Sequence, residues 1–210
     1  MNKVGYQDNV KTLTQIIGHR ERGHNIGLLG GTFNPVHTGH LIIADQVRSQ
    51  LGLDQVLLMP DAIPPHVDRK HAIDASHRVN MLRLATEDNA KLGLELSEIL
   101  RGGKSFSYDT IKELTHRFPN NNYYFIIGGD MVEYLPKWYR INDLIKMVQF
   151  VAVRRNGYPF TSKYPVVWVD VPMIDVSSTL IRSKLHQVQS IRYLVPTAVD
   201  NYIKENHLYE

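Results

Sequence analysis

The chain has 210 residues, of which 43% are hydrophobic and 21% are charged, as is ordinary for a globular protein with one substantial core. Its 24 Lys and Arg against 21 Asp and Glu leave a net charge of only +3, and the basic residues are scattered, so we expect no nucleic-acid partner. The absence of cysteine excludes disulfides and thiolate catalysis. No apolar run reaches the length of a membrane helix and residues 1–22 lack a signal-peptide core, so we expect a cytoplasmic protein that does not engage a membrane.

Residues 1–25 precede the first predicted strand. Val10, Leu13, Ile16 and Ile17 have approximate helical spacing, which predicts an N-terminal helical extension over 1–25 that packs on the body. The sequence gives this extension no chemical role.

Short apolar runs rich in β-formers recur after this point and alternate with helix-like segments. The predicted strands are Ile26–Leu29, Gln55–Met59, Leu94–Ile99, Tyr123–Ile127, Phe150–Val153 and Val166–Val169. The predicted helices are Leu41–Leu51, His77–Lys91, Asp109–Arg117, Asn142–Met147, Ser178–Gln187 and Pro196–Glu205.

This alternation predicts an α/β fold, a Rossmann-like, doubly wound parallel sheet with helices on both faces. There are no repeats and no linker, so we predict a single domain over residues 1–210. Ligands of such sheets gather at the carboxyl ends of the strands, near the point where the strand order reverses. The turn after the first strand lies at such an end.

That turn, Gly30–His40, stands between the apolar run Ile26–Leu29 and the amphipathic run Leu41–Leu51. The order predicts a strand, a glycine-rich turn and a helix. A helix N-terminus presents unpaired N–H groups and the positive end of the helix dipole, which suits phosphate. Glycines also let the backbone approach a ligand closely.

His37 and His40 are three residues apart where the turn becomes the helix, so they share one helix face. They could be a zinc pair or structural histidines. Zinc needs further ligands, however, and the other candidates, His66, His71 and His77, are dispersed. Hydrogen bonding to phosphoryl oxygens fits the position best, and we predict a nucleoside triphosphate site.

A second constellation, Asp175–Arg182, follows the strand Val166–Val169 and opens a helix. Its hydroxyls could simply cap the helix. Arg182 lies one turn after Ser178, however, so its guanidinium can reach the same helix end. Hydroxyls, N–H groups and arginine together favour a second polyphosphate clamp.

Together these motifs resemble the nucleotidyltransferase superfamily marked by an H-x-G-H signature and a distal S-S-T-x-I-R. Further segments are similar to bacterial nicotinate-nucleotide adenylyltransferases, and the resemblance covers about residues 26–209. These segments are Met59–His66 with its Pro-Pro-His, Gly128–Asp130, Leu135–Tyr139 and the ending from Tyr193 to Tyr209.

The resemblance implies transfer of AMP from ATP to nicotinate mononucleotide, giving deamido-NAD and pyrophosphate in NAD synthesis. It implies catalytic roles for His37, His40 and Arg182. It places ATP against Gly31, Thr32, Phe33, His37, His40, Gly128, Asp130, Ser177, Ser178, Thr179 and Arg182. It places the acceptor against His66, Ser107, Trp138 and Tyr139, with the pyridine ring stacked on Trp138. Mg²⁺ would be bound through the ATP phosphates rather than by protein ligands.

Bland alternatives stay open for two of these residues: Trp138 as a core or surface aromatic, and Asp130 as a helix N-cap. The sequence also departs from the family pattern. Val67 stands where a basic residue often follows the Pro-Pro-His loop, and Ser107 stands where threonine is usual.

Rival functions within the superfamily are an adenylyl- or cytidylyltransferase acting on phosphopantetheine or glycerol phosphate, and an adenylyltransferase acting on nicotinamide mononucleotide. Rivals of other classes are a catalytically silent nucleotide sensor and a tRNA-related protein. A sensor would be expected to lose a histidine or the arginine of the motifs, and the small size and modest charge disfavour a tRNA-related protein. Whether the chain forms a homo-oligomer is open.

Overall fold

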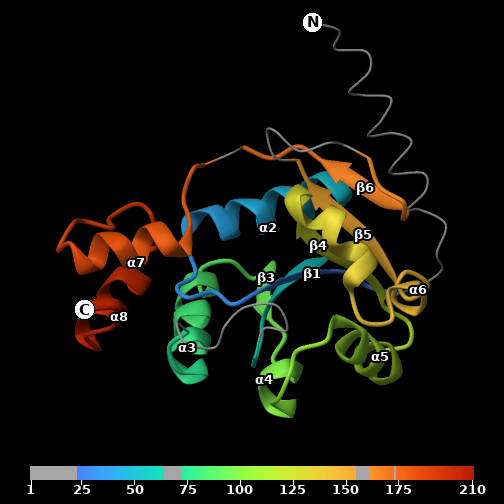
Figure 1. The fold of residues 1–210 in the computed structure, drawn as a ribbon, viewed down its shortest axis with the longest axis horizontal. Coiled ribbons are helices and arrows are strands. Elements are labelled where there is room, and N and C mark those ends of the chain that lie inside the picture. The colour runs from blue at the N-terminus through green and yellow to red at the C-terminus, as the bar shows by residue number, and fades with distance from the viewer. Residues whose placement is uncertain (1–22, 64–71, 155–160, 173) are drawn as a thin grey trace, which may run out of the picture.

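The computed structural model describes residues 23–63, 72–154, 161–172 and 174–210 (Figure 1). The strands are β1 (Asn25–Gly31), β2 (Gln55–Pro60), β3 (Leu92–Leu94), β4 (Asn122–Gly128), β5 (Val148–Val153) and β6 (Val166–Val169). The helices are α2 (Thr38–Leu51), α3 (Ala75–Thr86), α4 (Ser97–Arg101), α5 (Ser107–Arg117), the 3₁₀ helix η2 (Gly129–Lys137), α6 (Ile141–Leu144), α7 (Ser178–His186) and α8 (Thr197–Glu205).

The strands form one six-stranded sheet in the order β3-β2-β1-β4-β5-β6, and every pair is parallel. This is the Rossmann-like, doubly wound arrangement that the sequence predicts. The strand order reverses between β1 and β4: β2 and β3 follow β1 toward one edge of the sheet, and β5 and β6 follow β4 toward the other. β1 and β4 pair from Asn25 with Asn122 to Leu29 with Ile126. A crevice outside the carboxyl ends of these two strands is therefore the expected ligand site.

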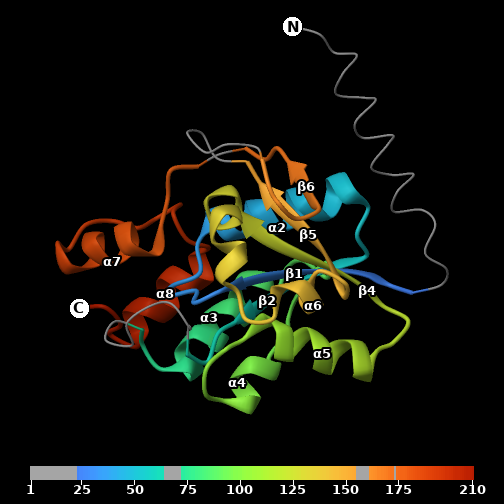
Figure 2. The ribbon, with the colours of Figure 1, turned by 45° about the vertical axis from the view of Figure 1, so that its right-hand side comes forward.

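Helices cover both faces of the sheet, because the strand residues alternate between two apolar cores. Along β4, Ile126 enters one core, whereas its neighbours Phe125 and Ile127 enter the other. The first core joins the sheet to α2, α3, α7 and α8, and the second joins it to α5, α6 and η2. Figure 2 shows β1 running between α2 and α5, with α7 and α8 together at one end.

Helix α2 begins and ends where local chemistry dictates. His37 is its N-cap with extended backbone, and Gly52 ends it in the left-handed conformation with φ of 61°. That conformation favours glycine. Val47 and Leu51 of the buried face then pack against the sheet.

One predicted strand, Leu94–Ile99, is wrong in most of its length. Only Leu94 belongs to β3, and Ser97–Arg101 forms α4. The Glu95 carboxylate accepts hydrogen bonds from the Ser97 N–H at 2.8 Å and from the Ser97 hydroxyl at 2.5 Å, next to the start of α4. The alternating pattern of this segment therefore reflects a strand end followed at once by a helix.

Other boundaries also move. The helix predicted over His77–Lys91 is α3, which begins earlier, after the Asp74 N-cap, and ends at Thr86. The helix predicted over Asn142–Met147 is the shorter α6, and η2 was not predicted. The N-terminal helical extension was predicted over residues 1–25. Asn25 instead begins β1, and residues 23–24 are not helical. Residues 1–22 lie outside the described residues.

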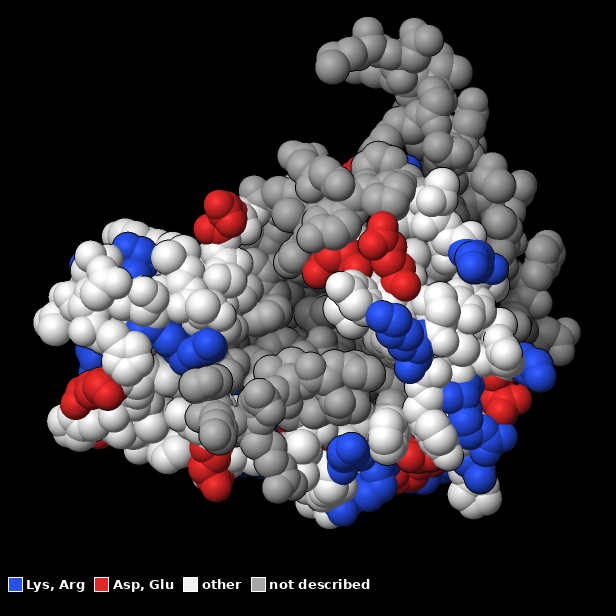
Figure 3. All heavy atoms as spheres, viewed as in Figure 1, with Lys and Arg blue, Asp and Glu red and all other residues white. Residues whose placement is uncertain are grey.

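Within the described part of the chain, no helix is both long and apolar enough to span a membrane. On the face shown in Figure 3, Lys and Arg side chains lie in small separate groups interspersed with Asp and Glu. No continuous basic surface is visible on that face.

Candidate active site

The start of α2 brings the two signature histidines together. Their rings stack with centroids 3.6 Å apart and an interplanar angle of 23°. The His37 N–H donates to His40 Nδ1 at 3.2 Å, and the His40 N–H points to the His37 side chain, which makes a reciprocal capping box. The histidines therefore have a structural role at the helix end as well as a position suited to an anion. His37 is 7% exposed.

Gly39 between them lies in a closely packed position. A Cβ at this position would lie 3.0 Å from Cγ1 of Val176 and 3.1 Å from Nδ1 of His37. Glycine thus lets the segment before α7 approach the N-terminus of α2. This contact joins the two motifs that the sequence separates by about 140 residues.

A cavity of about 240 Å³ lies between the two motifs. Its lining residues are His37, Gly39, His40, Ile43, Pro172, Ile174, Val176, Ser177 and Ser178. It thus lies between the N-termini of α2 and α7, where N–H groups and dipole ends favour an anion. Ser177 is also the N-cap of α7 and accepts from the Leu180 N–H at 3.1 Å, so the expected capping role is observed.

Three side chains from distant helices hold the carbonyls of the turn that follows β1. Arg78 of α3 donates to the Thr32 carbonyl at 2.8 Å. Arg182 of α7 donates to the Asn34 carbonyl at 2.8 Å.

Ser178 of α7 donates to the Pro35 carbonyl, also at 2.8 Å. Arg182 makes a further bond to the Thr179 hydroxyl at 3.3 Å, so its guanidinium stays next to the N-terminus of α7. Side chains of α3 and α7 therefore hold three carbonyls of the turn between the strand and α2.

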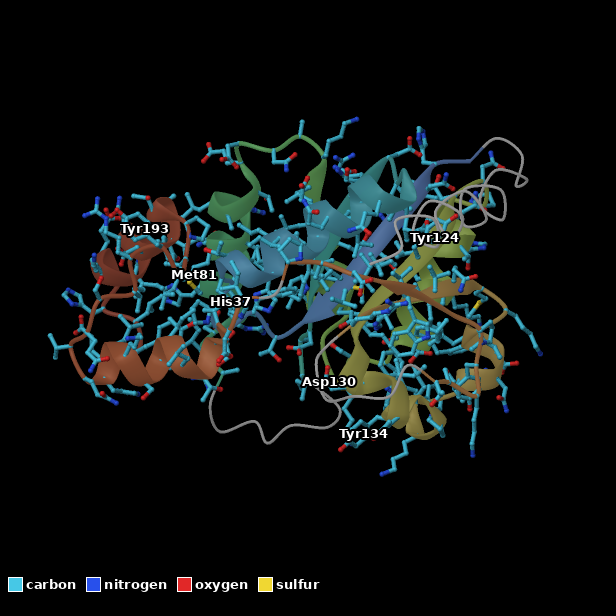
Figure 4. All side chains as sticks on the ribbon, turned by 90° about the horizontal axis from the view of Figure 1, so that it is seen from above. His37, Met81, Tyr124, Asp130, Tyr134 and Tyr193 are labelled. Carbon is cyan, nitrogen blue, oxygen red and sulfur yellow. The ribbon has the colours of Figure 1, made fainter. Side chains whose placement is uncertain are left out.

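A second cavity, of about 360 Å³, lies on the other side of the turn, outside the ends of β1 and β4. Three predicted acceptor residues, Ser107, Trp138 and Tyr139, line it. Gly31 and Thr32 at the end of β1 and Gly128 at the end of β4 line it as well. Figure 4 shows His37 and Asp130 on either side of the end of β1.

Trp138 is a pocket wall that is also braced by the core. Its ring meets Phe125 and Phe150 edge-on, with centroids 5.6 and 5.8 Å away. Its Nε1 is buried, and no hydrogen-bond partner for it lies among the described residues. The core contacts fix the plane of the indole at the cavity, which is the arrangement that ring stacking needs.

Two buried carboxyl groups line the same cavity. Asp61, directly after β2, accepts from the Thr32 hydroxyl at 2.7 Å and pairs with Arg78 at 3.4 Å. Arg78 is only 2% exposed and also donates to the Asp61 carbonyl at 2.9 Å. Burial raises the pKa of Asp61, and the bonds from Thr32 and Arg78 oppose that rise.

The second carboxyl group, Glu98 of α4, is the centre of a hydrogen-bond network at the start of α5. It accepts from the hydroxyls of Ser105 and of Thr110, the latter at 3.0 Å, and Arg101 donates to Thr110 at 2.6 Å. The Ala62 N–H in turn donates to the Ser105 hydroxyl at 2.9 Å. Burial raises the pKa of Glu98 despite these bonds. The network ties the segment after β2 to the N-terminus of α5.

Comparisons with known proteins show the family of the chain. A family model for cytidylyltransferase-like proteins matches residues 28–184. A probable nicotinate-nucleotide adenylyltransferase of Lactiplantibacillus plantarum is 56% identical over 207 residues, which cover 97% of this chain and 96% of the relative. The chain belongs to the nicotinate-nucleotide adenylyltransferase family.

An Enterococcus faecalis member of the family is 58% identical over 185 residues, which cover 88% of this chain and 84% of the relative. Among solved structures, a Plasmodium falciparum nicotinic acid mononucleotide adenylyltransferase complexed with NaAD aligns with a TM-score of 0.74. The alignment covers 89% of this chain and 97% of the Plasmodium falciparum chain, at 19% identity, and so supports a shared fold. Because the Lactiplantibacillus plantarum match takes in 97% of the chain, it extends into the first 25 residues.

Not every predicted site residue reaches a cavity. Phe33 is 2% exposed, and its ring meets His40 edge-on at 4.9 Å, so its side chain braces the histidine from the core. Asp130 lies in the first turn of η2, whose N-cap is Gly128, so the N-cap alternative for Asp130 is wrong. His66 lies outside the described residues.

Sequence reasoning missed Arg78 and Glu98 as parts of this site. Asp61 could have been found, because it directly follows β2 and so lies at the same carboxyl edge as the glycine turn. Arg78 and Glu98 give no local signal: each looks like one more charged residue of a helix. Their burial is created only when α3 and α4 fold against the strand ends.

No three His, Asp or Glu side chains among the described residues are grouped so that they could hold a metal ion.

Proposed function

We propose that the two cavities are the subsites of one adenylyl transfer, from ATP to the phosphate of nicotinate mononucleotide. The observation that carries the assignment is the position of the Gly30–His40 turn. Its first residues, Gly30, Gly31 and Thr32, wall the larger cavity, and its last, His37 and His40, wall the smaller one. Donor and acceptor phosphates bound in the two cavities would therefore meet along this turn.

The chemistry requires alignment more than activation. An oxygen of the acceptor phosphate, already anionic at neutral pH, forms a bond to the α-phosphorus of ATP. The bond from that phosphorus to the bridging oxygen breaks in line, and its electron pair leaves with pyrophosphate. No covalent enzyme intermediate and no general base are needed.

The small cavity would hold the triphosphate. His40 would donate to the α-phosphate and His37 to a neighbouring oxygen, while Ser177, Ser178, Thr179 and Arg182 would hold the β- and γ-phosphates. In support, Arg182 lies against the N-terminus of α7, where an anion is favoured. Gly31, Thr32, Phe33, Gly128 and Asp130 would bind the rest of the nucleotide.

The large cavity would hold nicotinate mononucleotide. Its pyridine ring would stack on Trp138, and its carboxylate would take the backbone N–H groups at Ser107 and Tyr139. Ser107 begins α5, whose first N–H groups have no acceptor within the helix. His66 is proposed for the acceptor phosphate.

Mg²⁺ bound between phosphate oxygens would supply charge neutralisation, with the phosphates themselves as its main ligands. Two expectations stay predictions from the sequence: a cytoplasmic location and the absence of a nucleic-acid partner. The sequence makes no choice between a monomer and a homo-oligomer.

An acceptor comparison tests the proposal. Pyrophosphate release from ATP and Mg²⁺ is measured with nicotinate mononucleotide, nicotinamide mononucleotide or phosphopantetheine as sole acceptor. We expect strong release with the first alone. Release with phosphopantetheine would overturn the Trp138 subsite, and release with the nicotinamide nucleotide would overturn only the carboxylate preference. No release from folded, ATP-binding protein would indicate a nucleotide sensor.

A further inference from the structure

Asn34, in the turn after β1, is the meeting point of three separate parts of the chain. Its backbone carbonyl accepts from Arg182 of α7 at 2.8 Å. Its side-chain oxygen accepts from the hydroxyl of Tyr209 at 2.8 Å and from the Ile73 N–H at 3.4 Å. The residue is 5% exposed, and all three bonds are partly buried. Tyr209 and Asn34 are 175 residues apart in sequence.

The chain takes an unusual path to bring Tyr209 to this position. After α8, His207 and Tyr209 both adopt left-handed backbone conformations, with φ of 50° and 66°. L-residues other than glycine rarely accept that conformation unless the surroundings impose it. Between them, Leu208 is 9% exposed and its N–H donates to the Ile203 carbonyl at 3.0 Å. This contact holds Tyr209 against the core that it shares with α3 and α7.

The Tyr209 hydroxyl acts as a neutral donor in this environment. Burial raises the pKa of Tyr209 well above its usual range, although the guanidinium groups of Arg182 and Arg78 oppose the rise. The phenol therefore keeps its proton at every physiological pH and can always donate to Asn34. The positive charges nearby belong to the two arginines that hold the Thr32 and Asn34 carbonyls.

We propose that Tyr209 is a positioning residue of the triphosphate subsite, acting through Asn34 on Arg182. By fixing the Asn34 side chain, the hydroxyl sets the direction of the carbonyl to which the Arg182 guanidinium is bonded. That bond keeps the guanidinium beside Thr179, at the N-terminus of α7. The inference rests on the proposed function, because it assumes that this helix end receives the phosphates.

Tyr202 provides a matched control. Its hydroxyl also joins distant parts of the chain, bonding to His77 at 2.9 Å and accepting from Asn80 at 3.0 Å. Both partners lie on α3, and none of the three residues lines either cavity. If the tyrosine hydroxyls in this region had only a structural role, Tyr202→Phe and Tyr209→Phe would change ATP affinity to the same extent.

The test measures ATP affinity by calorimetry, without acceptor, for the wild type, Tyr209→Phe and Tyr202→Phe, together with urea unfolding of each. We expect Tyr209→Phe to weaken ATP binding about five- to tenfold, the loss of one hydrogen bond. We expect an unchanged KM for nicotinate mononucleotide. Tyr202→Phe is expected to bind ATP as the wild type does, whatever its loss of stability. Wild-type ATP affinity in Tyr209→Phe, or an equal loss in both variants, would overturn the inference.

A double-mutant cycle separates action through Arg182 from a diffuse effect. In an Arg182→Met background, Tyr209→Phe is expected to change ATP affinity no further, and an undiminished effect there would overturn the proposed route. Failure of the proposed function is distinguishable from both results, because it would appear as wild-type protein that binds ATP but does not transfer the adenylyl group of ATP to nicotinate mononucleotide.

Discussion

His40 Nδ1 accepts a hydrogen bond from the backbone N–H of His37 at 3.2 Å, and the imidazole rings of the two residues stack on each other. A nitrogen that accepts carries no proton, so the neutral His40 ring has its proton on Nε2. The helix cap therefore selects the tautomer whose Nε2–H can donate to a phosphoryl oxygen. One residue pair closes the end of α2 and orients the proposed catalytic donor.

This relationship gives the first prediction. His40→Asn keeps a short acceptor near the His37 N–H but removes the Nε2–H. We expect kcat to fall by about 10²–10³-fold, as for loss of one transition-state donor. Because the cap is partly retained, we expect the free energy of unfolding to change by less than about 1 kcal/mol. His24→Asn, at the amino end of β1, is the control and should keep full turnover. Unchanged kcat in His40→Asn would contradict the role of His40.

Loss of the Trp138 indole is expected to raise the KM for the acceptor. Trp138→Ala should raise the KM for nicotinate mononucleotide about tenfold or more, since loss of a stacking platform costs about 1–3 kcal/mol. The KM for ATP should stay near that of the wild type. Trp168→Ala is the matched control, because Trp168 packs against the same apolar core but does not line the cavity. Equal effects of the two variants on acceptor KM would argue against stacking.

The Arg78–Asp61 pair predicts a large loss of stability with a specific rescue. Arg78→Met leaves Asp61 buried without its cation and also frees the Thr32 carbonyl, so unfolding in urea should show a loss of about 3–5 kcal/mol. Adding Asp61→Asn should restore part of that loss, since the amide oxygen can still accept from Thr32. A double variant no more stable than Arg78→Met would show that the carboxylate is not the source of the loss.

Glu98 predicts a pH dependence of stability. Its pKa in the folded state is raised above the ordinary value of 4.5, so the folded state holds this proton more tightly than the unfolded state. Its contribution to stability is therefore greatest at low pH and is lost as pH rises from about 4.5 through the raised pKa. Glu98→Gln removes this titration. Measured by urea unfolding, the stability of the variant minus that of the wild type should increase from pH 4.5 to pH 7, and a decrease would contradict the assignment.

Much of the architecture could be predicted from hydrophobic periodicity. Five of the six predicted strands are present, and the turn Gly30–His40 lies at the reversal of strand order as expected. The error at Leu94–Ile99 has a physical cause, because a β3 of three residues is followed by a helix of five, and neither is long enough to show its own period. The 3₁₀ helix η2 buries Val132 and Leu135 in the second core and lies against β4 and β5.

Site residues at the starts of helices could be predicted from local sequence. Site residues that depend on contacts between distant parts of the chain could not. His37, His40, Ser177 and Ser178 belong to helix starts, and the structure brings them to one cavity. Tyr209 could not be assigned a role, because its contact with Asn34 spans nearly the whole chain. This contact forms only when the C-terminal segment packs against the first core beside the turn.

The most direct test of the account follows the α-phosphorus itself. Wild-type protein is incubated with Mg²⁺, nicotinate mononucleotide and ATP labelled with ³²P at the α-position, and the products are separated. We expect the label to appear in deamido-NAD, the pyrophosphate to be unlabelled, and no label to stay on the protein after denaturation. Label bound covalently to the protein, or label that stays in ATP while the protein is folded and binds it, would contradict direct adenylyl transfer.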